Sequence, residues 1–377
     1  MNAKLLKPFH VFVSNGEVFI CDTHHNCVRK VLKDGQIVTI AGGVNNKDDV
    51  CFPTCVVVSS SNQVYISGAN SKILKINQAG MISTIAGTGG DGYNEDNQLA
   101  IHAQLNEPRG LFVTEDEEIF VADRDNHRVR KIDRNGIITT VAGTGIDGYN
   151  GDDILATRAQ LNCPRSVFVH QKEIYIADSE NNRIRKVLQN GIITTIAGTG
   201  VAGFNGNDEF ATSARINQPY GLFVHNDCVY FTDYLNHRVR KILPNGMIKS
   251  IAGTGIWLYN GEGKMATKAN LKCPAGIFVD DSGVYIACKG QERVRKIDSN
   301  GIITTVVGCG RAGFSSDVPF DFEKYPHIGP KKAANKPLIK PFPKALYDLI
   351  VHANFHHQNE EQDCDTCYEP LNKKVRR

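Results

Sequence analysis

The chain has 377 residues, of which 41% are hydrophobic, and its formal net charge is only +3. The composition is typical of a soluble globular protein, and the small charge neither requires nor excludes a polyanionic partner. The 11 cysteines are scattered singly along a long chain, which excludes a small disulfide-stapled scaffold.

The chain begins without the apolar stretch of a signal peptide. No later run approaches the roughly 18 consecutive apolar residues that a membrane-spanning helix needs. We therefore expect a soluble, cytoplasmic protein with no membrane span. The sequence contains no signal for an oligomeric state.

From Pro8 onward the chain repeats one series of short apolar runs. Later copies start at prolines spaced about 55 residues apart, namely Pro53, Pro108, Pro164, Pro219 and Pro274. After Pro108 the series reads RGLFV, IFVAD, NHRVRKI and NGIITTVAGTG. Runs rich in β-branched and aromatic residues between turn residues predict strands, and Asn-Gly before the last run predicts a tight hairpin. Each copy is therefore expected to form a four-stranded antiparallel sheet.

Six such sheets predict an all-β fold, a six-bladed β-propeller over residues 1–317. Packing the sheets around an axis buries both apolar faces of each one. A linear solenoid is the alternative, but neither end of the array carries a polar capping repeat. The chain enters and leaves the array within one connecting loop, so ring closure would depend on packing between the faces of the first and last blades. A Pro- and Lys-rich linker (318–342) and a short tail with one possible helix (343–377) follow.

The repeated series P-x-G-[LI]-F-V, [IV]-[FY]-[IVF]-[AT]-D and N-[HN]-R-[IV]-R-K resembles the NHL-repeat family of β-propellers. The loops that join consecutive blades, here called the inter-blade loops, carry AGTG…GYNGD…AT.AQLN.P, which is similar to the long form of the repeat. The resemblance covers all six copies. It implies a binding scaffold that contacts proteins or RNA, with a few enzymatic relatives on related propellers.

One polar triad recurs at the turn between the second and third strands, here called the central turn. Because it recurs, we expect it to build the fold: the carboxylate would accept backbone N–H groups of the turn and pair with the arginine. Three blades depart from the pattern and should be looser at this turn. Blade 1 has Cys27 in place of the arginine, blade 2 has Ser67 and Lys72 in place of the aspartate and the arginine, and blade 6 has Cys288 in place of the aspartate. The triads are Asp123, Asn126 and Arg128; Asp178, Asn181 and Arg183; and Asp233, Asn236 and Arg238.

The inter-blade loops also suggest two ligands, and we predict neither. AGTG could bind a phosphate through its backbone N–H groups. However, a phosphate-binding loop is followed by the start of a helix, whereas strands flank AGTG here. DGYNGDD offers acidic oxygens to calcium, but equivalent loops lose the acids. We expect no cofactor and no metal in the propeller.

Function should lie where the copies differ. The residues after the prolines are expected to surround the channel mouth on the face of the inter-blade loops, which places Arg109, Arg165 and Tyr220 side by side. His10 follows one position later in blade 1, and Trp257, the only tryptophan, replaces an aspartate at a loop tip. We predict that these five residues bind a protein or peptide, possibly an acidic one, without catalysis.

Two other functions stay open. RNA could follow a basic face, although many of the arginines are expected to pair with acids. A metal-dependent propeller hydrolase or lyase would need ligands on the inner strands, where only His10 and Cys55 are available. In the tail, Cys364 and Cys367 with His352, His356 and His357 suggest a zinc site, but their spacing is irregular and we predict no metal there.

Overall fold

The computed structural model describes residues 3–43 and 50–311. The chain divides into two compact units, Met1–Gly329 and Pro330–Arg377, and every described residue belongs to the first. The linker, the possible tail helix and the Cys/His cluster of the tail lie outside the described residues. Within them, no helix is long and apolar enough to cross a membrane.

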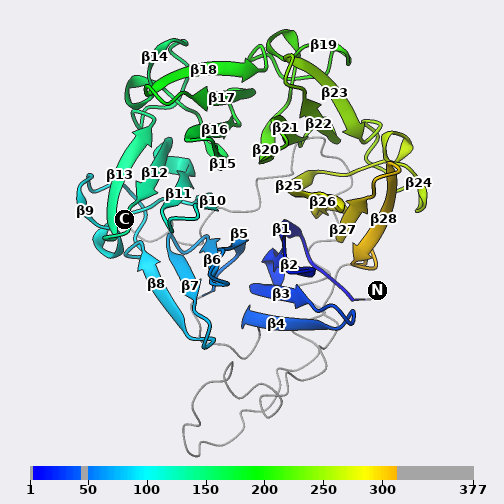
Figure 1. The fold of residues 1–377 in the computed structure, drawn as a ribbon, viewed down its shortest axis with the longest axis horizontal. Coiled ribbons are helices and arrows are strands. Elements are labelled where there is room, and N and C mark those ends of the chain that lie inside the picture. The colour runs from blue at the N-terminus through cyan, green and yellow to red at the C-terminus, as the bar shows by residue number, and fades with distance from the viewer. Residues whose placement is uncertain (1–2, 44–49, 312–377) are drawn as a thin grey trace, which may run out of the picture. The chain divides into compact units, whose positions relative to one another are not determined.

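Six antiparallel sheets follow one another along the chain and surround a common axis (Figure 1). The predicted six-bladed β-propeller is confirmed. Blade 1 contains β1 (Pro8–Ser14), β2 (Glu17–Asp22), β3 (Cys27–Val31) and β4 (Ile37–Gly42). Blade 2 contains β5 (Pro53–Val58), β6 (Val64–Gly68), β7 (Ile73–Ile76) and β8 (Ile82–Ala86). Blade 3 contains β10 (Pro108–Val113), β11 (Ile119–Asp123), β12 (Arg128–Ile132) and β13 (Ile137–Ala142).

The remaining blades keep the same order. Blade 4 contains β15 (Pro164–His170), β16 (Glu173–Asp178), β17 (Arg183–Val187) and β18 (Ile192–Ala197). Blade 5 contains β20 (Pro219–His225), β21 (Cys228–Asp233), β22 (Arg238–Ile242) and β23 (Met247–Ala252). Blade 6 contains β25 (Pro274–Asp280), β26 (Gly283–Cys288), β27 (Arg293–Ile297) and β28 (Ile302–Val307). The first strand of each blade lies nearest the axis (Figure 1).

Blades 3 to 6 carry a fifth strand that the sequence did not predict. The inter-blade loop leading into each blade runs past its outer edge and pairs two residues with its last strand. This pairing covers backbone groups that an edge strand would otherwise leave open. The fifth strands are β9 (Gln98–Leu99), β14 (Ile154–Leu155), β19 (Glu209–Phe210) and β24 (Lys264–Met265).

Seven short 3-10 helices complete the described segments. Three form central turns, and four follow the fifth strands within the inter-blade loops. They are η1 (Thr23–His25), η3 (Arg124–Asn126) and η7 (Lys289–Gln291) in the turns, and η2 (Ala100–His102), η4 (Ala156–Arg158), η5 (Ala211–Ser213) and η6 (Ala266–Lys268) in the loops.

The core is divided into six apolar clusters. Five lie between two neighbouring blades, and the sixth, between blades 1 and 2, extends across the hub to Tyr220 and Tyr234 of blade 5. One cluster joins the two ends of the array, with Leu5 and Val11 packed against Phe278 and Val294. Because β1 and β25 belong to separate sheets, the ring is closed by packing between blade faces, as the sequence suggested.

Candidate functional site

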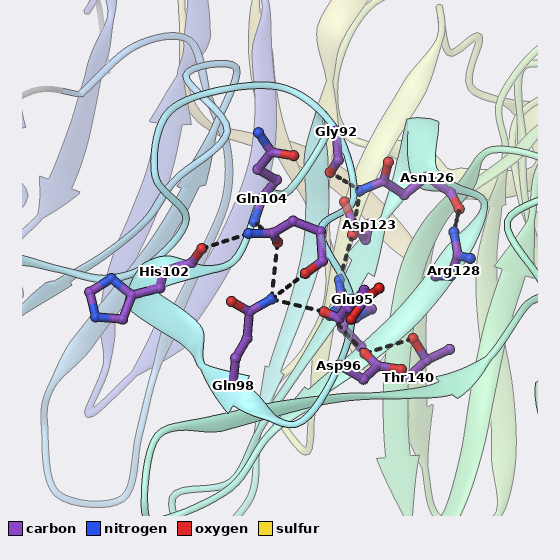
Figure 2. A network of polar contacts seen from close by, with 12 residues as sticks. Gly92, Glu95, Asp96, Gln98, His102, Gln104, Asp123, Asn126, Arg128 and Thr140 are labelled. Carbon is purple, nitrogen blue, oxygen red and sulfur yellow. Dashed lines mark hydrogen bonds and ion pairs between the residues drawn. The ribbon is translucent and has the colours of Figure 1, made fainter.

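The recurring aspartate is the centre of a buried polar network (Figure 2). In blade 3, Asp123 accepts hydrogen bonds from the backbone N–H of Asn106 at 2.8 Å and from the side chain of Asn126 at 2.8 Å. Asn126 also donates to the carbonyl of Gly92, at 2.6 Å. The network therefore ties the central turn to the inter-blade loop.

The charge partner of this aspartate was predicted incorrectly. Arg130, fully buried, lies 3.4 Å from Asp123, whereas Arg128 donates to the carbonyls of Asn126 and Thr144 at 3.1 and 2.7 Å. Arg128 and Arg130 are two residues apart on one strand, so their side chains lie on the same face. Their spacing in the sequence therefore does not show which one reaches the acid. Arg183 and Arg238 behave like Arg128, and Arg185 and Arg240 like Arg130.

The same arrangement explains the AGTG loop. Gly145 has φ +89°, and a Cβ atom there would lie 2.0 Å from the guanidinium of Arg128. The glycine is needed both for the left-handed backbone and for the space that Arg128 occupies. The loop residues once considered for calcium are also used internally: Asp152 accepts from Arg185 at 2.9 Å and from Thr195 at 3.0 Å.

Burial raises the pKa of Asp123, Asp178 and Asp233 to about 6, while the asparagine, backbone and arginine donors oppose that rise. Blade 1 retains the arrangement, because Asp22 lies 3.4 Å from Arg29 and accepts the backbone N–H of Leu6 at 2.7 Å. Blade 1 thus keeps the buried ion pair, and only the carbonyl contacts made by Arg128 in blade 3 are absent at Cys27.

Blades 2 and 6 do lose the aspartate. In blade 2 the strand register places Gly68, and not Ser67 as predicted, at the aspartate position, because the turn is one residue shorter. Ser67 lies 3.0 Å from Thr54, and an apolar Leu74 stands where the buried arginine would be. In blade 6, Cys288 replaces the acid while Arg295 stays fully buried. Arg295 pairs with Glu262 at 3.3 Å, but its Nη1 atom has no hydrogen-bond partner among the described residues.

The residues predicted at the channel mouth do meet there, but Arg165 and Tyr220 are buried and Arg109 is only partly exposed. Arg165 lies 4.1 Å from the ring centre of Tyr220, and Phe9 lies 5.6 Å from that ring on another side. Arg109 lies 5.1 Å from the ring of Phe9. Only 4% of Arg165 and 2% of Tyr220 is exposed, so these side chains fill the mouth of the channel.

Each arginine of the mouth also has an acidic neighbour. Arg109 pairs with Glu107 at 2.8 Å, and Arg165 pairs with Glu180 at 3.3 Å. The Arg109 side chain is 16% exposed, which makes it the more accessible of the two arginines.

Two members of this cluster were missed. Tyr234 stacks on Tyr220 with ring centres 4.1 Å apart, and Lys289 lies 3.3 Å from the Tyr234 hydroxyl and 5.1 Å from the Phe9 ring. Both residues directly follow the second strand of their blades. Comparing the copies at that position would have found them, since blades 3 and 4 carry Arg124 and Ser179 there.

His10 lies deeper in the channel. Its Nδ1 atom accepts the backbone N–H of Val56 at 3.4 Å, and its Nε2 atom lies 3.7 Å from the Cys55 sulfur. Desolvation lowers the pKa of His10 to about 4 and raises the pKa of Cys55 to about 12. Both side chains are therefore neutral near pH 7, unlike the thiolate–imidazolium pair of a cysteine nucleophile.

Trp257 is 54% exposed, with Lys272 lying 4.7 Å from its ring centre. Other large apolar side chains are exposed beside it in sequence and at matching positions of the two preceding inter-blade loops. They are Ile146, Val201, Ile256 and Leu258.

The family model described as Teneurin NHL domain matches residues 1–150 and 258–324, which is more than half of the chain. The chain belongs to the teneurin NHL domain family. This NHL propeller is 26% identical to Teneurin-1 of Homo sapiens over 342 residues, covering 79% of the chain and 12% of that protein. It is 25% identical to NHL repeat-containing protein 2 of Gallus gallus, covering 78% of the chain and 46% of that protein.

A third relative is Protein SUPPRESSOR OF QUENCHING 1, chloroplastic, of Arabidopsis thaliana, 26% identical with 76% of the chain and 29% of that protein covered. The NHL propeller thus spans less than half the length of these relatives. Their names do not place them in one compartment.

Solved structures share the fold. A protein of unknown function from Bacteroides thetaiotaomicron matches with a TM-score of 0.58 at 16% identity, covering 78% of the chain and 70% of that structure. Virginiamycin B lyase from Staphylococcus aureus matches with a TM-score of 0.50 at 19% identity, covering 81% and 86%. At such low identity the likeness concerns the fold alone.

Proposed function

We propose that this NHL propeller is a non-catalytic module that binds a protein or peptide through the tips of its inter-blade loops. The observation that carries the proposal is the row of exposed apolar side chains at equivalent loop positions in blades 4 to 6. Ile146, Val201 and Ile256 follow AGTG in three successive loops, and Trp257 and Leu258 extend the last one. Exposed apolar residues gathered on one face are typical of interaction sites, and tryptophan is frequent among their anchors.

Among the five residues predicted from the sequence, we assign Trp257 and Arg109 to direct contact. Arg165, Tyr220 and His10 would support the contact surface from below, because they are largely enclosed in the hub. Glu107 and Glu180 already neutralise the two arginines, which favours an apolar partner surface over a strongly acidic one.

A non-catalytic role is supported by the inner strands, which contribute no acid to the channel lining. The arginines that RNA would use on the loop face, Arg128, Arg183 and Arg238, donate instead to backbone carbonyls of the fold. The cytoplasmic location stays a prediction.

The test restores the common loop sequence in the full chain with Trp257→Asp and Leu258→Gly together. Partners captured by the wild-type chain are purified, and their affinity is measured directly. We expect at least a tenfold loss of affinity, since a buried tryptophan anchor contributes more than 1.4 kcal/mol.

The matched control is Phe210→Ser, which removes an exposed aromatic side chain from a fifth strand on the outer edge of blade 5. It should leave the affinity unchanged. Equal affinity of the loop variant and the wild type would contradict the proposal, and salt-sensitive retention on RNA by both proteins would favour the RNA alternative.

A further inference from the structure

The channel of the propeller contains a cavity of about 130 Å³ that the proposed binding face does not use. It is lined by the first strands of all six blades, and none of its lining residues carries a formal charge at neutral pH. Five phenylalanines from five blades contact one another in a ring within the hub, and all but Phe278 line the cavity. They are Phe12, Phe112, Phe168, Phe223 and Phe278.

The ring is incomplete at one blade. Neighbouring phenylalanines lie with ring centres 4.5 Å apart between Phe112 and Phe168 and 4.8 Å apart between Phe12 and Phe278. Blade 2 places Val57 at the equivalent position, between Phe12 and Phe112. The smaller side chain leaves space in the hub, and Val57 lines the cavity.

Two polar side chains reach this otherwise apolar space. His10 Nδ1 accepts the N–H of Val56, so the proton of the neutral ring lies on Nε2. Nε2 faces the Cys55 sulfur at 3.7 Å, a weak acceptor that a ligand oxygen would replace. The Ser166 oxygen accepts the N–H of Leu222 at 3.3 Å, which leaves its hydroxyl proton to donate as well. Both residues line the cavity.

We propose that the channel cavity binds a small uncharged molecule, a ring of about six heavy atoms bearing one carbonyl oxygen. An apolar cavity of roughly 150 Å³ in another protein holds benzene, so this space suits a ring of that size. Apolar walls with a few converging polar groups are typical of ligand pockets, and a charged ligand would lose its hydration without a partner. The carbonyl oxygen would accept hydrogen bonds from His10 and Ser166.

The test uses the full chain with two probes of the same shape, cyclohexanone and methylenecyclohexane, titrated calorimetrically. We expect cyclohexanone to bind at least fivefold more tightly, because only its oxygen can accept the two hydrogen bonds. Ser166→Ala should weaken cyclohexanone severalfold and leave methylenecyclohexane unchanged. Equal affinities for the two probes, or no binding of cyclohexanone at millimolar concentration, would overturn the proposal.

Val57→Phe gives the decisive variant, because it places the residue of the other five blades at the gap. It should abolish binding of both probes while the protein remains folded. If this variant does not fold, Val57→Leu fills part of the space and should weaken both probes. Unchanged binding in a folded Val57 variant would place the ligand elsewhere and refute the channel site.

Discussion

Blades 3 to 5 and blade 2 hold the same central turn in different ways. Blades 3 to 5 bury an aspartate against an arginine, whereas blade 2 has Gly68 and Leu74 at these two positions. The inter-blade loops explain the difference. The buried arginine also donates to a carbonyl of the long loop that leads into its blade, at 2.9 Å from Arg185 to Gly151 and at 3.2 Å from Arg295 to Gly261.

Blade 6 sharpens this comparison, because it keeps the arginine after losing the aspartate. Its inter-blade loop is long and carries a fifth strand, like those of blades 3 to 5. We infer that in blades 3 to 6 the arginine fastens the loop that carries the fifth strand, and that the aspartate offsets the buried charge. Blade 1 keeps Asp22 and Arg29 in a four-stranded sheet, so the pair itself does not depend on a fifth strand. The propeller thus uses one charge network to fasten the loops that form its proposed binding face.

The largest expected effect comes from removing the acid of blade 4. Asp178→Ala removes the fully buried counterion of Arg185, which keeps only the partly exposed Asp152, and leaves the donors of Asn162 and Asn181 without their acceptor; it should reduce the free energy of unfolding by about 3 kcal/mol. Ser67→Ala in blade 2, at the register position of Ala177, should cost about 1 kcal/mol, because only its hydroxyl hydrogen bonds to Thr54 and to the Arg109 carbonyl are lost. Urea unfolding of the two variants measures both values.

The two charged residues of the blade 4 turn can also be replaced together. Asp178→Ser combined with Arg185→Leu removes both charges and should be less destabilising than Asp178→Ala alone. A double variant as unstable as the single one would contradict the assignment of the cost to an arginine that has lost its buried counterion.

The second effect compares the inner strands of blades 4 and 5. A Cβ atom on Gly221 would lie 2.4 Å from the carbonyl oxygen of Ala275, so Gly221→Ser should reduce the free energy of unfolding by about 3 kcal/mol. Blade 4 carries Ser166 at this position, and Ser166→Gly should cost about 1 kcal/mol through loss of one hydrogen bond. Thermal and urea unfolding distinguish them, and equal costs would mean that the hub adapts freely to added side chains.

The third effect separates His10 from the aspartates by pH. The pKa of His10 is lowered to about 4 in the folded protein, below an unfolded value of about 6.5. Its contribution to stability is therefore present above about pH 6.5 and is lost as the pH falls through about 4. Asp123 acts in the opposite direction, because its pKa is raised to about 6 and its contribution declines as the pH rises through that value.

The variant His10→Gln isolates the histidine contribution. Between pH 7 and pH 4.5 the wild type should lose roughly 2 kcal/mol more of its free energy of unfolding than the variant does. Urea titrations at the two pH values provide the measurement. A difference that does not change with pH would mean that His10 is as well solvated in the channel as in the unfolded chain.

The sequence predicted the fold well because the repeat exposes it six times. The strands, the hairpin turns and the closure by packing followed from residue patterns that recur in every blade. The fifth strands could not be predicted in this way, because two residues such as Gln98 and Leu99 are too few to show the apolar–polar alternation of a strand. The partner of Asp123 was also missed. Arg128 and Arg130 lie on one face of the strand and differ in how deeply they are buried, which the sequence does not show.

The candidate site was predicted in position but not in accessibility. Comparing the copies placed Arg165 and Tyr220 correctly in the hub. It could not show that Tyr234 and Lys289 arrive from the central turns of blades 5 and 6 and complete a packed cluster. Burial there depends on contacts between blades, which a single repeat does not encode.

The smallest expected effect is a gain of stability in blade 6. Cys288→Asp supplies the carboxylate found in blades 3 to 5 beside a buried arginine whose Nη1 atom lacks a partner among the described residues. The hydrogen bond to a charged donor should outweigh the desolvation of the new carboxylate by about 1 kcal/mol.

Cys288→Asn provides the control, because it offers an acceptor of the same shape without the charge. Urea unfolding should rank Asp above Asn, and Asn near the wild-type cysteine. If Asn stabilises the protein as much as Asp, Arg295 lacks only a hydrogen-bond acceptor and Glu262 already balances its charge. If Asp destabilises the protein, the pairing of Arg295 with Glu262 at 3.3 Å already neutralises the buried arginine. The aspartate of blades 3 to 5 would then stabilise the fold mainly by accepting the backbone N–H of the inter-blade loop.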